Sequence, residues 1–307
     1  MTYTGSHQLI EEETLPLFYQ KRYYPVKIGD IFKQQYRIIA KLGYGAYSTF
    51  CLARDERSKQ YISLKVCIED GTETSPVVNE VAMLRRLSEF AREADHPGLD
   101  FTRLARDIFE IDGPYGRHYC IATKPQGSSL RTLQETFADA IFPRTLVKSL
   151  VHHISPQNVL TAFGDETIFK DIEDQESQDP STPIMNDGVP VYRSRPVTVE
   201  LSGIPILTDF GQMRLAEPMN NDWWMSDSYR APEVLLKLPW AFPVDVWSVG
   251  VMLLEGRSLF DPIDRVHDQY VLPLALSQYI GYLGPPPLEM IKRSPLFQTY
   301  FDEEGKF

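Results

Sequence analysis

Three apolar segments in close succession constrain the fold of this chain most strongly. Residues 36–42 and 50–53 flank a short turn that contains glycine, and residues 61–66 follow with apolar and polar side chains in alternation. Alternation with a period of two is typical of β-strands, and short turns join strands that run antiparallel. The sequence therefore predicts that an antiparallel sheet begins near residue 36.

The turn over residues 43–48 contains two glycines two positions apart, Gly43 and Gly45. Where Cβ atoms are missing, the backbone can approach a ligand closely and its N–H groups can bind phosphate oxygens. An ordinary hairpin turn would have a similar composition, so the glycines alone leave both interpretations open.

A helix is predicted to begin at Pro76, because Ser75 suits the N-cap and proline suits the first helical position. The apolar residues that follow recur at helical spacing: Val77, Val81, Leu84 and Leu87. Glu80 lies on this helix and is the natural partner for Lys65 in the third predicted strand, although a lone lysine is more often a solvated charge. An ion pair between them would direct the ammonium group toward nucleotide phosphates.

Later motifs are more specific. A strand over residues 119–122 and the turn-rich residues 123–127 form a candidate hinge between two lobes. Residues 204–208 lead into Asp209-Phe210-Gly211, where the carboxylate suits Mg²⁺, the ring packs and glycine lets the loop turn. Tyr-Arg-Ala-Pro-Glu at 229–233 and Asp-Val-Trp-Ser-Val-Gly at 245–250 follow, and together the three motifs are a strong signal.

Together these motifs resemble the eukaryotic-type protein kinases. The closer resemblance is to the serine/arginine-rich-protein kinase family of the CMGC group, in a fungal form, and it is carried by residues 24–30, 41–45, Ser48-Thr49 and 192–196. The resemblance implies a bilobal α+β fold with a small antiparallel β-sheet N-lobe, one helix, and a mainly α-helical C-lobe. It implies the following divisions: an N-terminal extension at 1–22, the N-lobe at 23–123, and a shortened C-lobe at 124–307 with an acidic insert at about 162–200.

The resemblance also assigns residues to a site that uses ATP and Mg²⁺. The implied ATP-binding residues are Leu42, Gly43, Gly45, Ser48, Phe50, Lys65, Glu80, Thr123, Lys124 and Gln126. The implied catalytic-loop residues are His153, Ser155 and Asn158, and the implied metal ligands are Asn158 and Asp209. The reaction would transfer the γ-phosphoryl group of ATP to serine in arginine/serine-rich proteins, with a role in mRNA splicing regulation.

The catalytic loop departs from the family pattern. Counting back from Asn158, His153 stands where the catalytic aspartate is expected, and Ser155 stands where a lysine is usual. The helix before the loop also looks short, since only residues 143–150 have helical character. Two alternatives follow: a working Ser/Thr kinase, or a pseudokinase that binds nucleotide and arginine-rich clients without efficient transfer.

Two further alternatives are disfavoured. A small-molecule phosphotransferase would share the two-lobed plan, but the motifs at 229–233 and 245–248 argue against it. Metal binding by His152 and His153 is disfavoured because adjacent residues rarely face one ligand and no third partner is evident.

Composition sets the remaining expectations. The 307 residues include 42 acidic and 31 basic side chains, a net charge of −11, which favours a basic partner over direct binding to nucleic acid. No apolar run approaches the roughly 18 residues of a membrane span, and the N-terminus lacks a signal-peptide pattern. The three cysteines are widely spaced, which argues against a disulfide framework or a zinc site. We expect a monomer in the cytoplasm and nucleus.

The acidic insert has two interpretations. Residues 165–179 contain seven acidic side chains and the single basic residue Lys170. Such a composition favours a solvated, partly disordered insert. The alternative is an acidic docking surface for arginine-rich clients.

Overall fold

The computed structural model describes residues 9–69, 72, 75–129, 132, 158–163, 166–195, 204–215, 219–254 and 259–307. Its contacts divide the chain into two compact units. The first contains residues 1–128 and 160–213, and the second contains residues 129–159 and 214–307. The first unit is therefore built from two stretches of chain that part of the second unit separates in the sequence.

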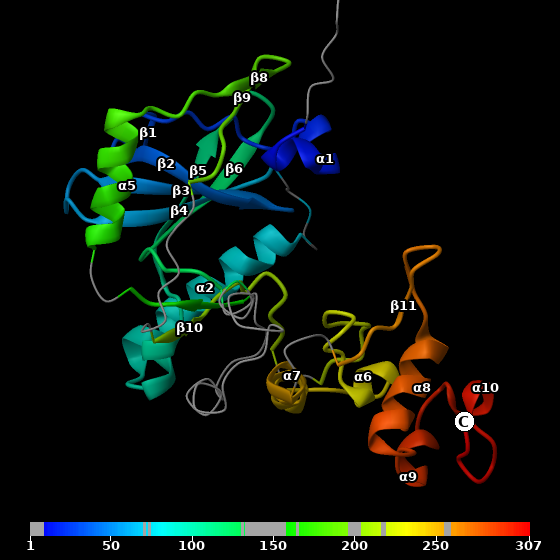
Figure 1. Cartoon of the computed structure of the whole chain (residues 1–307). Helices are drawn as coiled ribbons and strands as arrows, with labels where there is room; N and C mark the ends of the chain where they lie inside the picture. The colour runs from blue at the N-terminus through cyan, green and yellow to red at the C-terminus, as the bar shows by residue number, and fades with distance from the viewer. Residues whose placement is uncertain are drawn as a thin grey trace, which may run out of the picture. The chain divides into compact units, whose positions relative to one another are not determined.

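A six-stranded antiparallel sheet forms the centre of the first unit (Figure 1), with the order β1-β2-β3-β4-β6-β5. The strands are β1 (Ile31–Phe32), β2 (Tyr36–Gly45), β3 (Ser48–Asp55), β4 (Tyr61–Cys67), β5 (Ala105–Asp112) and β6 (Arg117–Thr123). Gly45 pairs with Ser48, so only Ala46 and Tyr47 form the turn between β2 and β3. The expected turn at 43–48 is therefore too long, because β2 continues through both glycines.

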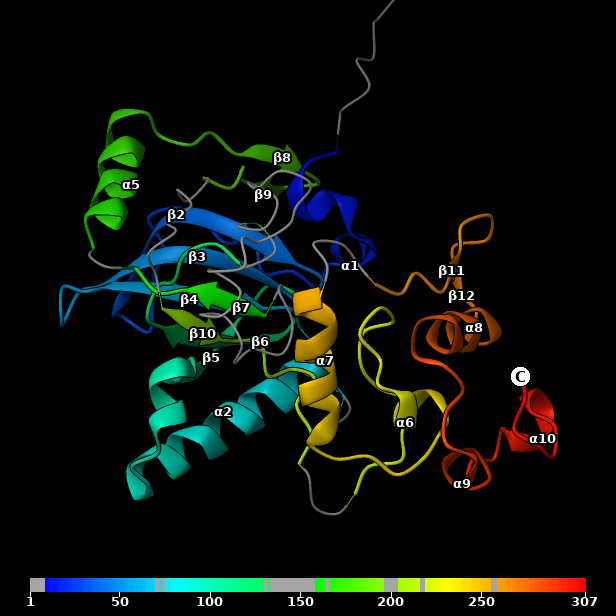
Figure 2. The same cartoon turned by 60° about the horizontal axis from the view of Figure 1, so that its bottom comes forward.

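Helix α2 (Pro76–Glu93) packs on one end of this sheet (Figure 2), and its predicted start is confirmed. The Ser75 hydroxyl accepts a hydrogen bond from the N–H of Val77 at 3.1 Å, which caps the first turn. The predicted apolar stripe is also confirmed, since Val77, Val81 and Leu84 are at most 3% exposed and pack with residues of β4 and β6.

The acidic insert is folded where it is described, which corrects the interpretation that favoured partial disorder. Helix α5 (Thr167–Gln178) lies on the β2 side of the sheet (Figures 1 and 2). Its Phe169 and Ile172 are 2% and 4% exposed and pack against Leu52 and Tyr61. Most acidic residues of the helix lie on its remaining surface, whereas Glu176 is buried and forms an ion pair with Arg195. The composition alone therefore concealed the buried face of an amphipathic helix.

Helix α5 covers the same face of the sheet that carries Lys65. Phe50 lies opposite Lys65 in the β3–β4 register, and Leu52 follows Phe50 by two positions. Side chains two apart in a strand point to the same face. The insert therefore covers part of the same face, at Leu52 and Tyr61.

Three further segments complete the first unit. β8 (Ile184–Asn186) and β9 (Val189–Val191) form a hairpin whose Asp187-Gly188 turn has positive φ at both residues, as a two-residue hairpin turn requires. β9 lies against the short 3₁₀ helix η1 (Glu11–Thr14), which precedes α1 (Pro16–Tyr19). β7 (Val159–Thr161) pairs with β10 (Pro205–Leu207), which leads into Asp209.

The described part of the second unit is mainly helical. Its elements are α6 (Pro232–Leu235), α7 (Pro243–Leu254), β11 (Ile263–Asp264), β12 (Gln269–Tyr270), α8 (Leu272–Leu283), α9 (Leu288–Ile291) and α10 (Phe297–Tyr300). Its core contains the stacked rings of Phe260 and Tyr279, whose centroids are 3.7 Å apart. An antiparallel N-terminal sheet followed by a helical part confirms the expected α+β fold class.

Replacing Phe169 with alanine should lower the free energy of unfolding of the first unit by about 3 to 5 kcal/mol, because a large buried side chain leaves a cavity. Denaturant unfolding followed by fluorescence measures the change. Lys170→Ala, on the exposed side of the same helix, is the matched control and should change stability by less than about 0.5 kcal/mol. Equal effects of the two changes would mean that α5 does not pack on the sheet.

Candidate active site

The predicted ion pair between β4 and α2 is present. Lys65 Nζ lies 2.6 Å from Glu80 Oε2, and the two side chains are only 14% and 9% exposed. Phe50, opposite Lys65 in β3, places its ring centroid 5.5 Å from the same ammonium group. The cap at Ser75 and the buried stripe of α2 turn Glu80 toward the sheet, so the pair follows from how the helix packs.

The charges near Lys65 keep it protonated. Burial alone would lower its pKa, but the carboxylates of Glu80 and Asp209 act in the opposite direction and raise the pKa above its ordinary value. The ammonium group is therefore a fixed positive charge that is poorly solvated, which is the state needed to bind phosphate strongly.

Asp209, Phe210 and Gly211 are held against α2. The Phe210 ring is 6% exposed and belongs to the core around α2. Asn79 of α2 donates its side-chain N–H to the carbonyl of Gly211 at 2.9 Å and to that of Met213 at 3.1 Å. A Cβ on Gly211 would lie 3.2 Å from the carbonyl oxygen of Pro76, so this close approach favours glycine. The segment is thus positioned by the same helix that supplies Glu80.

The glycine hairpin, defined as residues 43–48, has an open inner face. Neither Gly43 nor Gly45 has a positive φ, and a Cβ on either would meet no atom within 4 Å. The backbone conformation and the surrounding protein therefore do not require glycine there, and the space beside both residues is open. Leu42 is partly buried against the apolar cluster that contains Phe169 and Ile172 of α5. Ser48 is buried at the start of β3.

Arg103 lies near the charges of Glu80 and Asp209, and the sequence did not predict it as part of the site. Its Nε donates a hydrogen bond to the Thr123 hydroxyl at 2.9 Å. Its Nη2 donates a hydrogen bond to the Ser63 hydroxyl at 3.1 Å. Burial lowers its pKa to about 10, although Glu80 and Asp209 oppose this. A single arginine before a strand carries no spacing signal, so only the folded structure reveals that it lies behind Thr123.

The candidate hinge follows β6. Lys124 is exposed, whereas the Gln126 side-chain oxygen is buried and has no hydrogen-bond partner among the described residues. Gly127 donates its N–H to the carbonyl of Thr161 at 2.7 Å, and a Cβ there would lie 2.5 Å from the Thr161 hydroxyl. The hinge backbone therefore lies directly beside β7.

The catalytic-loop assignments have a different status. His153 and Ser155 lie outside the described residues, as does the short helix expected at 143–150. Asn158 is half-buried and immediately precedes β7. By the division of contacts, Asn158 belongs to the second unit and Asp209 to the first.

The residues of the first unit fit a magnesium nucleotide. Magnesium is usually held by one or two carboxylates together with phosphate oxygens and water, so Asp209, whose charge acts on Lys65, meets that need without a cage of protein ligands. In the described part of the chain no group of three or more His, Cys, Asp or Glu side chains could hold a metal by itself. Lys65 and the glycine hairpin supply groups suited to the phosphates. The buried Gln126 oxygen, which has no hydrogen-bond partner among the residues that the structure describes, suits a polar ring.

Sequence comparison with known proteins identifies the family of this chain. No protein-family model matches the chain. A serine/threonine protein kinase of Aspergillus fumigatus, found in two strains, is 34% identical over 313 residues, which cover 97% of this chain and 77% of the relative. This chain belongs to the serine/threonine protein kinases. Within these kinases it is of the SRPK/CLK-like type in the CMGC group.

More distant kinases give the same class. The serine/threonine-protein kinase SRPK of Physarum polycephalum is 26% identical over 96% of this chain and 78% of its own length. SRSF protein kinase 3 of mouse is 29% identical over 177 residues, which are 52% of this chain and 31% of that kinase. Among the described residues of this kinase, no helix combines the length and apolarity needed to cross a membrane.

Proposed function

We propose that this kinase binds Mg²⁺-ATP in its first unit and transfers the γ-phosphoryl group slowly to serine in arginine/serine-rich proteins. The observation that carries the proposal is the buried ion pair between Lys65 and Glu80 beside Asp209. Protein kinases need a strand lysine paired with a helix glutamate, and a metal-binding aspartate, in place together.

Each residue of the first unit has a role in this proposal. Glu80 orients Lys65, whose ammonium group binds the α- and β-phosphates. The backbone of the glycine hairpin approaches the phosphates, and Asp209 holds Mg²⁺, which when bound neutralises charge on the phosphoryl oxygens. The residues proposed to surround the adenosine are Leu42, Ser48, Phe50, Thr123, Lys124 and Gln126.

The proposed slow rate follows from His153. An imidazole with an ordinary pKa near 6.5 can accept the proton of the attacking serine hydroxyl. It lacks the negative charge that an aspartate would use to orient that hydroxyl, and Ser155 supplies no positive charge for the transferring group. The second candidate function, a pseudokinase that binds nucleotide and clients, is favoured by this same substitution.

The proposed substrate class rests on charge and on relatives. A net charge of −11 attracts arginine-rich segments, and similar kinases include one named SRPK and one named SRSF protein kinase 3. We therefore propose a monomer that acts on splicing factors or similar proteins in the cytoplasm and nucleus. Burial raises the pKa of the Cys51 and Cys67 thiols to about 12, so neither thiol is expected to react.

Transfer from γ-labelled ATP to an arginine/serine repeat peptide tests the proposal. We expect slow, Mg²⁺-dependent labelling of serine, and weaker labelling of a matched lysine/serine peptide, because only arginine offers a planar fork of donors. Nucleotide binding without any labelling would favour the pseudokinase. Equal labelling of both peptides would contradict the proposed substrate class.

A further inference from the structure

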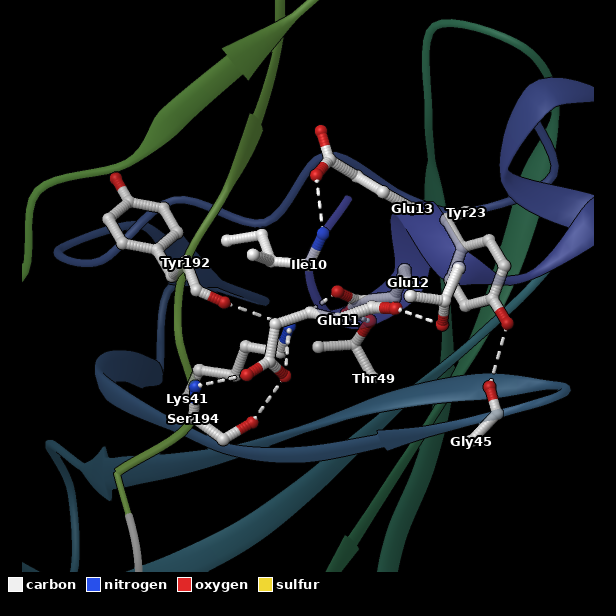
Figure 3. Close-up of polar contacts among 11 residues, drawn as sticks. Ile10, Glu11, Glu12, Glu13, Tyr23, Lys41, Gly45, Thr49, Tyr192 and Ser194 are labelled. Carbon is white, nitrogen blue, oxygen red and sulfur yellow. Dashed lines mark hydrogen bonds and ion pairs between the residues drawn. The ribbon is translucent and has the colours of Figure 1, made fainter. Parts of the chain in front are cut away.

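The outer face of the glycine hairpin is held by residues that lie outside the nucleotide site. Lys41 of β2 forms an ion pair with Glu12 of η1, and its Nζ lies 3.2 Å from Glu11 Oε2 (Figure 3). Glu12 also accepts a hydrogen bond from the Thr49 hydroxyl of β3 at 2.7 Å. One carboxylate therefore joins the two strands of the hairpin from outside.

Tyr23 contacts the tip of the hairpin directly. Its hydroxyl lies 2.7 Å from the carbonyl oxygen of Gly45 (Figure 3). It also lies 3.0 Å from the carbonyl oxygen of Ala46. Burial and the nearby Glu12 carboxylate raise the pKa of Tyr23, so the hydroxyl keeps its proton and can donate. The Tyr47 carbonyl accepts a hydrogen bond from the N–H of Ile68 at 2.9 Å.

The folded insert joins the same network. Lys41 Nζ donates to the carbonyl of Tyr192 at 3.0 Å, and the N–H of Arg195 donates to the Lys41 carbonyl at 2.9 Å. The Ser194 hydroxyl donates to Glu11 at 2.7 Å. Three segments that are distant in the sequence thus meet behind the hairpin, a set we call the outer clamp: Glu11, Glu12, Tyr23, Lys41, Thr49, Tyr192 and Ser194 (Figure 3).

The hairpin needs such support for a physical reason. Glycine weakens a strand because it loses more conformational freedom on folding and offers no side chain for packing. Gly43 and Gly45 leave the inner face without packing, since a Cβ on either would meet no atom within 4 Å. Lys41 and Glu12 are only 5% and 6% exposed. Removing one partner of a buried ion pair is strongly destabilising, because the other charge is left buried without compensation.

We propose that Glu12, Lys41 and Tyr23 are positioning residues that hold the glycine hairpin ready for the triphosphate, so that the N-terminal segment and the insert set nucleotide affinity from outside the site. This inference rests on the proposed binding of Mg²⁺-ATP. When only part of the population holds the binding-competent hairpin, the apparent affinity falls by that fraction.

Two variants test the outer clamp. Glu12→Gln removes one charge, and Tyr23→Phe removes one hydroxyl and keeps the ring in the core. Both should speed hydrogen exchange of the amides of Gly45 and Ser48, which pair where β2 and β3 meet the turn, in the nucleotide-free protein. Both should weaken Mg²⁺-ATP binding about five-fold, the loss expected if the competent hairpin falls to roughly one fifth of the population. Binding of adenosine, which lacks phosphates, should change less than about two-fold.

Glu173→Gln is the matched control. Glu173 accepts hydrogen bonds from Arg54 at 2.9 Å and from the Tyr61 hydroxyl at 2.6 Å, and so holds α5 to the same sheet without touching the hairpin. It should leave hairpin exchange and Mg²⁺-ATP affinity unchanged. If Glu12→Gln does not fold, Tyr23→Phe carries the test.

The outcomes separate the two proposals. Unchanged hairpin exchange in the clamp variants overturns the inference, and so does faster exchange with unchanged Mg²⁺-ATP affinity. If the wild-type protein binds no nucleotide, the proposed function fails, and the exchange measurement alone decides whether the three residues order the hairpin.

Discussion

Replacing His153 with aspartate should accelerate phosphate transfer to an arginine/serine peptide by roughly 10²–10⁴-fold, the usual contribution of a well-placed general base. The carboxylate would accept the proton of the serine hydroxyl and would add the negative charge that orients it. Steady-state labelling at saturating Mg²⁺-ATP measures the change, because at saturation the nucleotide affinity no longer limits the rate.

The neighbouring histidine supplies the control for this prediction. His152→Asp introduces the same charge one residue away and should leave the transfer rate near that of the wild type. A wild-type rate already as fast as that of His153→Asp would contradict the assignment of His153. Equal acceleration by both changes would show that added charge, and not its position, is responsible.

Replacing Asp209 with asparagine should weaken Mg²⁺-ATP binding about 100-fold, which corresponds to roughly 3 kcal/mol for loss of one partner from a charged contact. In the absence of Mg²⁺, ATP binding should stay the same or tighten, since a carboxylate near the phosphates repels them. Asn suits the position because Asp209 has a φ of 61°, in the left-handed region that Asn tolerates better than most residues.

Asp187→Asn is the matched control for this change. Asp187 also has a positive φ, of 48°, but it lies exposed in the turn between β8 and β9. Its replacement should leave nucleotide binding unchanged with and without Mg²⁺. A loss of affinity for Asp209→Asn that is equal with and without Mg²⁺ would contradict a metal-binding role.

Local patterns in the sequence were sufficient for the core of the candidate site. The alternation in β4 and the cap and apolar stripe of α2 fix which way Lys65 and Glu80 point, so their ion pair follows from two short segments. Gly43 and Gly45 predict a turn over residues 43–48, but β2 continues through both glycines and the turn is shorter.

Long-range contacts account for what the sequence did not predict. In α5, Phe169 and Ile172 are outnumbered by acidic neighbours, and their burial depends on a sheet more than a hundred residues earlier in the chain. Glu12 is one of three consecutive glutamates, and only the folded structure shows that it meets Lys41. Arg103, which precedes β5, likewise could not be predicted, because its partner Thr123 lies at the end of β6.

Calorimetric titration of the wild-type protein with ATP tests most directly whether the first unit holds a triphosphate through Lys65 and a metal ion. We expect saturable binding at a single site in the presence of Mg²⁺, with a Kd in the range of about 1 μM to 1 mM that is usual for enzyme substrates, and much weaker binding when Mg²⁺ is removed. Absence of binding, or an affinity that does not depend on Mg²⁺, would contradict the account.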